Sequence, residues 1–182
     1  MQHRRRLKLS VLATGMAILL SLAATGWSDS FPRITVKTLI GSPFVLPDQM
    51  EAAVNILVVG FTQKAGTKTR LWTERLRKDF TPANGFAVYT VAVLAGVPSL
   101  FRSLALGSVR SGIPEDQRDR FLIVDRDEDL WRRLTGYRLP DDPYIVALDK
   151  AGEVLIRASG PFNDKTYDDV ASAIRSAAGG KQ

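Results

Sequence analysis

Short apolar runs along the chain alternate with stretches in which apolar residues recur every third or fourth position. Residues 34–39 alternate apolar and polar, which is typical of a half-buried strand, and the turn 41–43 leads into a returning strand at 44–46. Continuous apolar runs predict further strands, buried on both faces where they are longest. These strands are expected at 55–61, 86–94, 121–124, 144–148 and 153–157.

Four segments have helical periodicity. The first helix follows a loop at 62–66, with Thr67 or Thr69 as its cap. The second begins at Pro98 and is broken by 107–112. The third is capped by Asp127 and ends at Gly136, and the last runs from near Asn163 to Gly179. Their apolar positions are Leu71, Trp72, Leu76, Phe80, Leu100, Phe101, Leu104, Leu130, Trp131, Leu134, Tyr167, Val170, Ala171, Ile174, Ala177 and Ala178.

The order of these elements predicts an α/β fold. Strands separated by helices imply a parallel centre, and the late hairpin at 144–157 adds antiparallel strands. The result is a mixed sheet with helices on both faces. We expect a leader at 1–26, a linker at 27–33, one domain at 34–178 and a tail at 179–182.

Cysteine and histidine are nearly absent. The 182 residues include no cysteine, and the single histidine is His3, in the leader. Thiol catalysis, disulfides and Cys-ligated metals are therefore excluded, and the body has no histidine for a Ser-His-Asp triad or a His-ligated metal. We expect no metal and no cofactor.

The formal charge of +6 is largely a property of the leader. Four of the 25 basic residues lie in the first eight positions, which leaves 21 basic against 19 acidic residues afterwards, a net charge of +2. A body so close to neutral lacks the excess of basic residues that a surface binding nucleic-acid phosphates needs.

The leader has the three parts of a secretory signal peptide. Residues 1–8 are basic, 9–22 are mostly apolar, and 23–26 are small. Cleavage is expected after Ala23 or Gly26. The alternative is an uncleaved N-terminal membrane anchor, because the apolar run reaches the lower limit of roughly 17 residues for a bilayer span. Either interpretation places the body in the periplasm or another extracytoplasmic compartment.

The hairpin at 34–46 and the segment from Asp142-Pro143 through the strand 144–148 to Asp149-Lys-Ala-Gly152 carry a family resemblance. The chain resembles the thioredoxin-like superfamily, in its TlpA and peroxiredoxin branches, over residues 34–178. The resemblance implies a thioredoxin-like mixed β-sheet flanked by helices, with an N-terminal β-hairpin extension. It also implies that Pro143 is the family's cis proline.

The chain departs from that family where its chemistry resides. The family carries Cys-x-x-Cys after the first long strand, whereas this chain reads Phe61-Thr-Gln-Lys-Ala-Gly66-Thr-Lys-Thr69-Arg70, with Gly66 and Thr69 at the expected cysteine positions. A threonine hydroxyl needs a base that the body does not supply as histidine. Thiol–disulfide exchange and cysteine peroxidase activity therefore do not carry over, and we expect a protein that is not an enzyme.

Two candidate binding sites remain. Asp142, Pro143 and the loop 62–69 would form a groove for an extended peptide, as the resemblance implies; the alternative is an ordinary turn proline. A helix start at Gly66, Thr67, Lys68, Thr69 and Arg70 would instead bind a phosphate or carboxylate through free N–H groups and cations.

An acidic segment at 125–129 resembles the start of a calcium loop. It lacks the glycine at the sixth position and the glutamate at the twelfth, so a solvated loop is the favoured interpretation. The sequence leaves open an alternative in which two carboxylates act as a pair in acid–base catalysis, drawn from Asp125, Asp127, Asp141 and Asp142.

Residues 106–114, followed by the strand at 144–148 and its Asp149, also resemble the family of mitochondrial ATP-synthase assembly factors, which are thioredoxin-like and lack the redox pair. The favoured hypothesis is thus an exported, redox-inactive thioredoxin-like domain that binds protein partners, as a chaperone or assembly factor on a membrane complex. The alternative is a small-anion or ligand-binding protein, or a carboxylate-based enzyme, that uses the helix start at 66–70.

Overall fold

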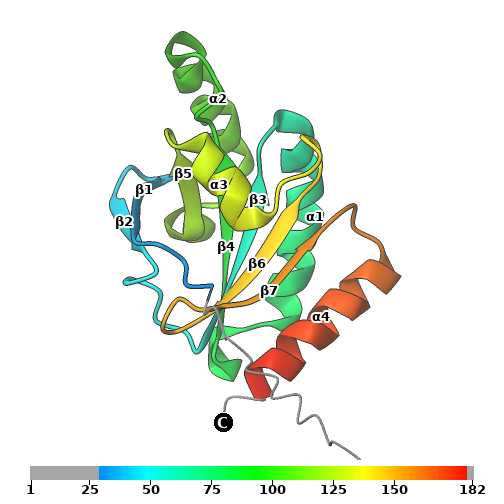
Figure 1. Cartoon of the computed structure of the whole chain (residues 1–182). Coiled ribbons are helices and arrows are strands. Elements are labelled where there is room, and N and C mark those ends of the chain that lie inside the picture. The colour runs from blue at the N-terminus through cyan, green and yellow to red at the C-terminus, as the bar shows by residue number, and fades with distance from the viewer. Residues whose placement is uncertain (1–28, 180–182) are drawn as a thin grey trace, which may run out of the picture.

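The computed structural model describes residues 29–179 (Figure 1). Seven strands form one sheet in the order β2-β1-β5-β4-β3-β6-β7, in which β3, β4 and β5 are parallel and the other pairs are antiparallel. The strands are β1 (Ile34–Thr38), β2 (Pro43–Leu46), β3 (Val54–Gly60), β4 (Phe86–Val93), β5 (Phe121–Val124), β6 (Tyr144–Asp149) and β7 (Val154–Ser159). The helices are α1 (Gln63–Asp79), α2 (Ser99–Gly112), α3 (Glu128–Thr135) and α4 (Asp164–Gly179), with short 3-10 turns η1 (Pro82–Asn84) and η2 (Glu115–Arg120).

The central strand β3 is buried along its whole length. Leu57 and Val59 pack into the cluster on one face of the sheet, and Ile56 and Val58 pack into the cluster on the other. Each such side chain contributes roughly 1.5–3 kcal/mol by leaving water. The sequence prediction of a doubly buried strand and a mixed sheet is confirmed.

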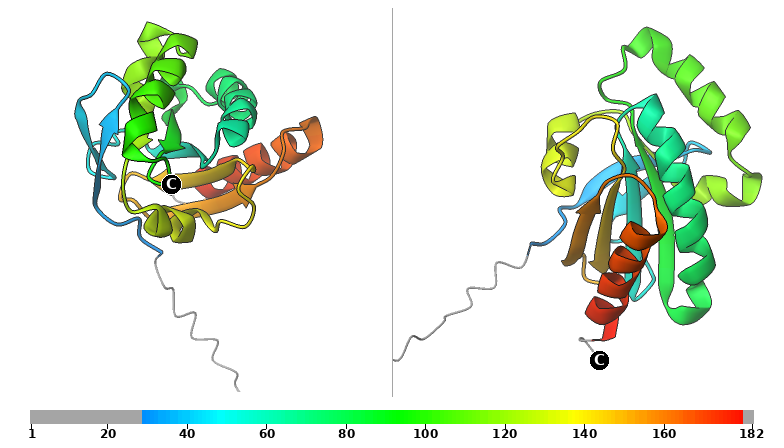
Figure 2. Two further views of the ribbon diagram at one scale, coloured as in Figure 1. Left: turned by 90° about the horizontal axis from the view of Figure 1, so that it is seen from above. Right: turned by 90° about the vertical axis from the view of Figure 1, so that its right-hand side faces the viewer.

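Helices cover both faces of this sheet (Figure 2). Trp72 and Leu76 of α1 pack with Tyr167 and Ile174 of α4 on one face. The second half of α2 lies on the same face, where its apolar side chains contact Leu39, Phe121 and Ile123. The helix α3 lies on the opposite face, where Trp131 and Leu134 are buried.

The first helix begins earlier than predicted. Thr62 is its N-cap, since the Thr62 hydroxyl accepts a hydrogen bond from the Ala65 N–H at 3.0 Å. The expected loop at 62–66 is therefore the first turn of α1, and neither Thr67 nor Thr69 caps it. The predicted apolar stripe is correct for Trp72 and Leu76, but Leu71 is 45% exposed.

Two other helix predictions need correction. The second helix does not break at Gly107 but continues to Gly112, because Leu106 and Val109 pack on the sheet on either side of that glycine. Asp127 precedes α3 as expected, yet its side chain makes no capping bond and its φ is 58°, in the left-handed region.

The expected linker at 27–33 belongs in part to the domain. Phe31 is 2% exposed, its N–H donates to the Gly152 carbonyl at 2.8 Å, and its ring packs against Trp131 at 5.8 Å between centroids. Ser30 also bridges to Glu153 beside β7. The domain therefore begins by residue 30. The leader itself lies outside the described residues. Within 29–179, no helix is long and apolar enough to span a membrane.

Candidate functional site

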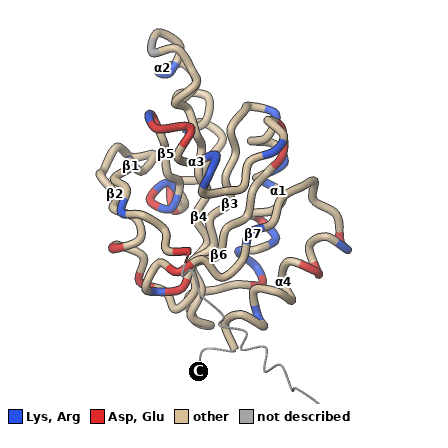
Figure 3. Tube along the Cα trace, in the orientation of Figure 1, with Lys and Arg blue, Asp and Glu red and all other residues tan. Residues whose placement is uncertain are grey.

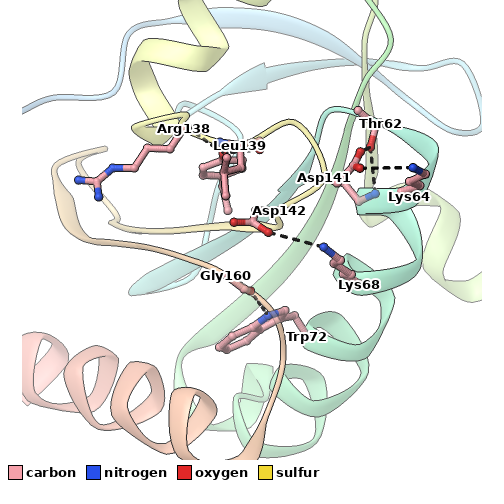
Figure 4. A network of polar contacts seen from close by, with 11 residues as sticks. Thr62, Lys64, Lys68, Trp72, Arg138, Leu139, Asp141, Asp142 and Gly160 are labelled. Atoms are coloured by element: carbon pink, nitrogen blue, oxygen red, sulfur yellow. Dashed lines mark hydrogen bonds and ion pairs between the residues drawn. The ribbon is translucent and has the colours of Figure 1, made fainter.

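Two segments that are distant in sequence meet where β3 ends and α1 begins (Figure 4). Thr62 and the first two turns of α1 face the loop 137–143, which connects α3 to β6. The arrangement follows from the pairing of β3 with β6, which aligns Val59 with Tyr144. We call this region the sheet edge.

A polar network joins the two sides of the sheet edge. The Thr62 hydroxyl donates to Asp141 Oδ1 at 2.7 Å while it accepts the Ala65 N–H. Lys64 Nζ lies 3.8 Å from Asp141 Oδ2, and Lys68 Nζ lies 3.6 Å from Asp142 Oδ1. One hydroxyl, two carboxylates and two ammonium groups thus connect α1 to the loop.

The Tyr144 side chain supports the backbone of the loop 137–143. This side chain is fully buried, and its hydroxyl accepts the N–H groups of Arg138 and Leu139, each at 2.8 Å. The same hydroxyl donates to the Leu139 carbonyl at 2.7 Å. The ring of Phe61 packs edge-on against those of Tyr137 and Tyr144. The carboxylates of the loop are therefore presented on a supported backbone.

Of the residues proposed from the sequence, Asp142, Pro143 and Lys68 lie at the sheet edge. The Pro143 carbonyl accepts the N–H of Gly160 at 3.2 Å. The expected cis peptide bond does not occur at Pro143. The cis bond found among residues 29–179 is Leu46–Pro47.

The other four proposed residues lie within α1 rather than at its start. The Gly66 N–H is already bonded to the Thr62 carbonyl at 3.0 Å, and the Thr69 hydroxyl is buried and donates to the Gly66 carbonyl. Thr67 and Arg70 are exposed on the outer surface, where Arg70 pairs with Glu74 at 3.8 Å. The predicted helix start at Gly66–Arg70 is therefore wrong, and with it the set of free N–H groups proposed for an anion. Gly66 and Thr69, which the resemblance puts at the family's two cysteine positions, also lie inside α1, which begins at Gln63 after its N-cap Thr62.

Three of the four carboxylates considered for acid–base work belong to separate networks, and the fourth, Asp127, lies directly before α3. Asp141 and Asp142 belong to the sheet edge, whereas Asp125 pairs with Lys37 of β1 at 3.1 Å and with Arg126 at 3.3 Å. The hydrogen bond from Lys37 lowers the pKa of Asp125 below its usual value. Among the described residues, no group of three or more acidic or other metal-ligating side chains is placed to hold a metal ion.

Sequence reasoning included Thr62 and Lys64 only as part of a loop at 62–69, and it missed the capping role of Thr62, the pairing of Lys64 with Asp141 and the role of Tyr144. A threonine directly after a buried strand is a signature of an N-cap, and that signal was present for Thr62. The partners of Lys64 and Tyr144 depend on the position of the loop 137–143, which no local pattern in the sequence reveals.

The fold was compared with known proteins. No protein-family model matches the sequence, and no curated protein matches it. A thiol:disulfide interchange protein of the thioredoxin family from Chlorobium tepidum TLS aligns with a TM-score of 0.54 and 16% identity, over 83% of this chain and 97% of its own. An exposed lipoprotein thioredoxin from Streptococcus pneumoniae strain TIGR4 aligns with a TM-score of 0.58 and 12% identity, over 80% and 99%.

A third structure, the thioredoxin domain of a thiol-disulfide oxidoreductase from Bacteroides vulgatus, aligns with a TM-score of 0.50 and 19% identity, over 80% of this chain and 95% of its own. The narrower resemblance to assembly factors finds no support in these comparisons. At such identities the alignments establish architecture alone. The chain has a thioredoxin-like fold, and it carries that fold without cysteine.

Proposed function

We propose that this chain is an exported, redox-inactive thioredoxin-like domain that binds a protein partner at the sheet edge. The observation that carries the proposal is the polar network directly after β3, the position at which the family that the sequence resembles carries Cys-x-x-Cys. Thr62, Asp141 and Asp142, together with two lysines, form this network, and Asp142 keeps a 20% exposed side chain.

The chemistry of this network favours recognition over catalysis. The Thr62 hydroxyl both donates and accepts a hydrogen bond, so its role is to cap α1 and to fix the loop. Charged pairs at a partly exposed edge contribute little to stability, typically below about 1 kcal/mol. They are well suited to exchange partners with an incoming polypeptide, because Lys64 and Lys68 keep side chains that are 83% and 39% exposed.

Export is supported by the basic, apolar and small-residue parts of the leader 1–26. One protein of the same fold is described as an exposed lipoprotein. A chaperone or assembly role would follow if the bound partner belongs to a membrane complex.

The test is site-specific photocrosslinking in the native envelope. A photoreactive residue replaces Leu139, whose side chain is 58% exposed at the sheet edge, and a matched control replaces Lys165 on α4, whose side chain is 86% exposed. We expect one crosslinked protein from position 139, none from position 165, and a marked loss of product in Asp142→Ala.

Equal products from both positions, or none from 139, would refute the proposal. Mass spectrometry of the crosslinked species identifies the partner. The same run reads the N-terminus of the mature chain, and a start at Ala24 or Trp27 would establish cleavage of the leader.

A further inference from the structure

The loop 137–143 presents two neighbouring exposed side chains, those of Arg138 and Leu139, on a backbone that one buried residue fixes. The Tyr144 hydroxyl accepts the N–H groups of Arg138 and Leu139, each at 2.8 Å, and donates to the Leu139 carbonyl at 2.7 Å. Both backbone polar groups of Leu139 are therefore bonded to Tyr144, while Leu139 itself is 58% exposed. We call these two residues the Arg138–Leu139 pair.

The backbone of this pair is preorganised for binding. The Tyr144 hydroxyl uses its one donor and both acceptor positions on the loop. The Tyr144 ring is fixed in turn, because it stacks on Tyr137 at 5.6 Å between centroids and meets Phe61 edge-on. A single exposed leucine on a surface is ordinary, but a leucine on a fixed backbone loses little further entropy when a partner covers it. Leu139 is thus suited to be an anchor.

The charges of the sheet edge do not balance. Each of its two carboxylates faces one lysine, with Nζ–Oδ distances of 3.8 and 3.6 Å. The Arg138 side chain extends from the loop away from Asp141 and Asp142 (Figure 4), and among residues 29–179 it has no ion pair or hydrogen bond. The segment 132–140 contains three arginines and no acidic residue (Figure 3). The site therefore has one cation more than it has anions, and Arg138 is the unmatched one.

An unmatched guanidinium beside an apolar anchor defines the chemistry of a partner. The planar N–H groups of arginine bond both oxygens of a carboxylate at once, which makes a carboxylate the preferred counterpart. Arg138 and Leu139 are consecutive, so their Cα atoms lie about 3.8 Å apart. A partner that satisfies both must bring a carboxylate and an apolar side chain equally close together. A polypeptide segment with an acidic residue next to an apolar one meets this requirement.

Other occupants match the pair less well. An anionic bilayer or a nucleic acid presents many phosphates, which would also meet the carboxylates of Asp141 and Asp142, and like charges oppose association. A small anion would bond Arg138 but would leave Leu139 in water. A second copy that met the pair face to face would bring two Arg138 side chains together.

We propose that the Arg138–Leu139 pair is the recognition element of the sheet edge, and that it binds a partner segment in which a carboxylate lies next to an apolar side chain. Tyr144 is the positioning residue for this element. The inference rests on the proposed function and adds the chemistry of the partner.

The test uses the full-length chain in its native envelope, with the apolar photoreactive residue at position 139. Arg138→Glu should lower the crosslinked product several-fold, whereas Arg138→Lys, which keeps the charge, should lower it by no more than about twofold. The matched control is Lys150→Glu, which changes the net charge by the same amount. Lys150 is exposed and follows the end of β6 that lies opposite Tyr144, so we expect no change in product.

Reciprocal substitution tests the partner. Mass spectrometry of the product gives the crosslinked segment, and the acidic residue of that segment is replaced by lysine. This change alone should lower the product several-fold, and its combination with Arg138→Glu should restore it. Once the partner is identified, its copurification with Leu139→Ser after formaldehyde crosslinking should fall by about tenfold.

Tyr144→Phe tests the positioning role. The variant loses only the hydroxyl and keeps the ring contacts with Phe61 and Tyr137. Hydrogen exchange at the Arg138 and Leu139 amides should become at least about tenfold faster, because both lose their acceptor. The product from position 139 should fall several-fold, while far-UV circular dichroism stays that of the wild type.

Four results would overturn the inference and leave the proposed function standing, provided that the unmodified Arg138 chain gives its protein product. They are an undiminished product in Arg138→Glu, an equal loss in Lys150→Glu, no restoration by the reciprocal substitution, and a folded Tyr144→Phe chain with unchanged amide exchange or unchanged product. No product from position 139, or crosslinks only to lipid, nucleic acid or a second copy, would refute the inference and the proposed function together.

Discussion

Removal of the Thr62 hydroxyl should destabilise the protein more than removal of any similar hydroxyl in the same helix. Thr62→Val keeps the branched shape but loses both the cap to the Ala65 N–H at 3.0 Å and the bond to Asp141 at 2.7 Å. Loss of an N-cap costs about 1 kcal/mol. A hydrogen bond to a charged group contributes about 1.5–3 kcal/mol, but the Asp141 side chain is 39% exposed and regains water. We therefore count about 1 kcal/mol for this bond.

The expected total is about 2 kcal/mol. For a chain of this size, each kcal/mol lowers Tm by roughly 2–4 °C, so Thr62→Val should melt roughly 4–8 °C below the wild type. Urea unfolding followed by tryptophan fluorescence measures the free energy directly. Thr62→Ser keeps the oxygen and should stay within about 0.5 kcal/mol of the wild type.

Thr69→Val is the matched control. It removes a buried hydroxyl from the same helix, but that hydroxyl only donates to the Gly66 carbonyl within α1, so we expect a small effect. A double-mutant cycle between Thr62→Val and Asp141→Ala should give a coupling free energy of about 1 kcal/mol. The reasoning is refuted if Thr62→Val costs no more than Thr69→Val, or if the coupling is zero within error.

Two further substitutions test the packing and the ionisation of the core. Gly152→Ala should lower the free energy of unfolding by at least about 1–2 kcal/mol more than Gly85→Ala, as measured by urea unfolding. Both glycines have a positive φ (83° and 80°), so both substitutions carry the same backbone strain, but an added Cβ would lie 2.5 Å from Pro47 Cγ at Gly152 and 3.6 Å from the nearest atom at Gly85. Equal costs would contradict the steric argument. Burial, with the hydrogen bond donated to Asp79 at 2.6 Å, raises the pKa of Tyr167 above its ordinary value of 10.0. The unfolded chain then ionises first, so the contribution of Tyr167 to stability is complete below about pH 10 and falls by up to ~1.4 kcal/mol per pH unit above it. In Tyr167→Phe, the free energy of unfolding measured in urea should fall less steeply between about pH 9 and 11. An unchanged pH dependence would show that Tyr167 is not the group responsible.

Periodicity in the sequence was sufficient for the sheet and for the presence of all four helices. The strand at 54–60 is readable because seven consecutive residues suit burial on both faces, and α4 is readable because Tyr167, Val170 and Ile174 recur with the helical period. Both patterns are local, so they are visible without knowledge of the neighbours. The absence of cysteine was equally decisive about thiol chemistry, since no arrangement of the chain supplies a missing sulfur.

Helix boundaries were less readable, because several residues offer the same local signal. Thr62, Thr67 and Thr69 can all cap a helix, and the bond from Thr62 to Asp141, 79 positions away, accompanies the start that the structure adopts. Gly107 marks a break in the local pattern, but the packing of the residues around it against the sheet carries α2 through to Gly112.

Of the seven proposed site residues, Lys68, Asp142 and Pro143 lie at the sheet edge, where Lys68 pairs with Asp142. The sequence did not reveal the contact of Phe31 with Trp131, the exposure of the apolar residues in the first half of α2, or the pairing of Lys64 with Asp141. By itself the sequence determined which segments form strands and helices and which chemistry is absent. Only the tertiary structure decided which side chains meet and which stay uncovered, because both depend on how strands far apart in the chain are ordered in the sheet.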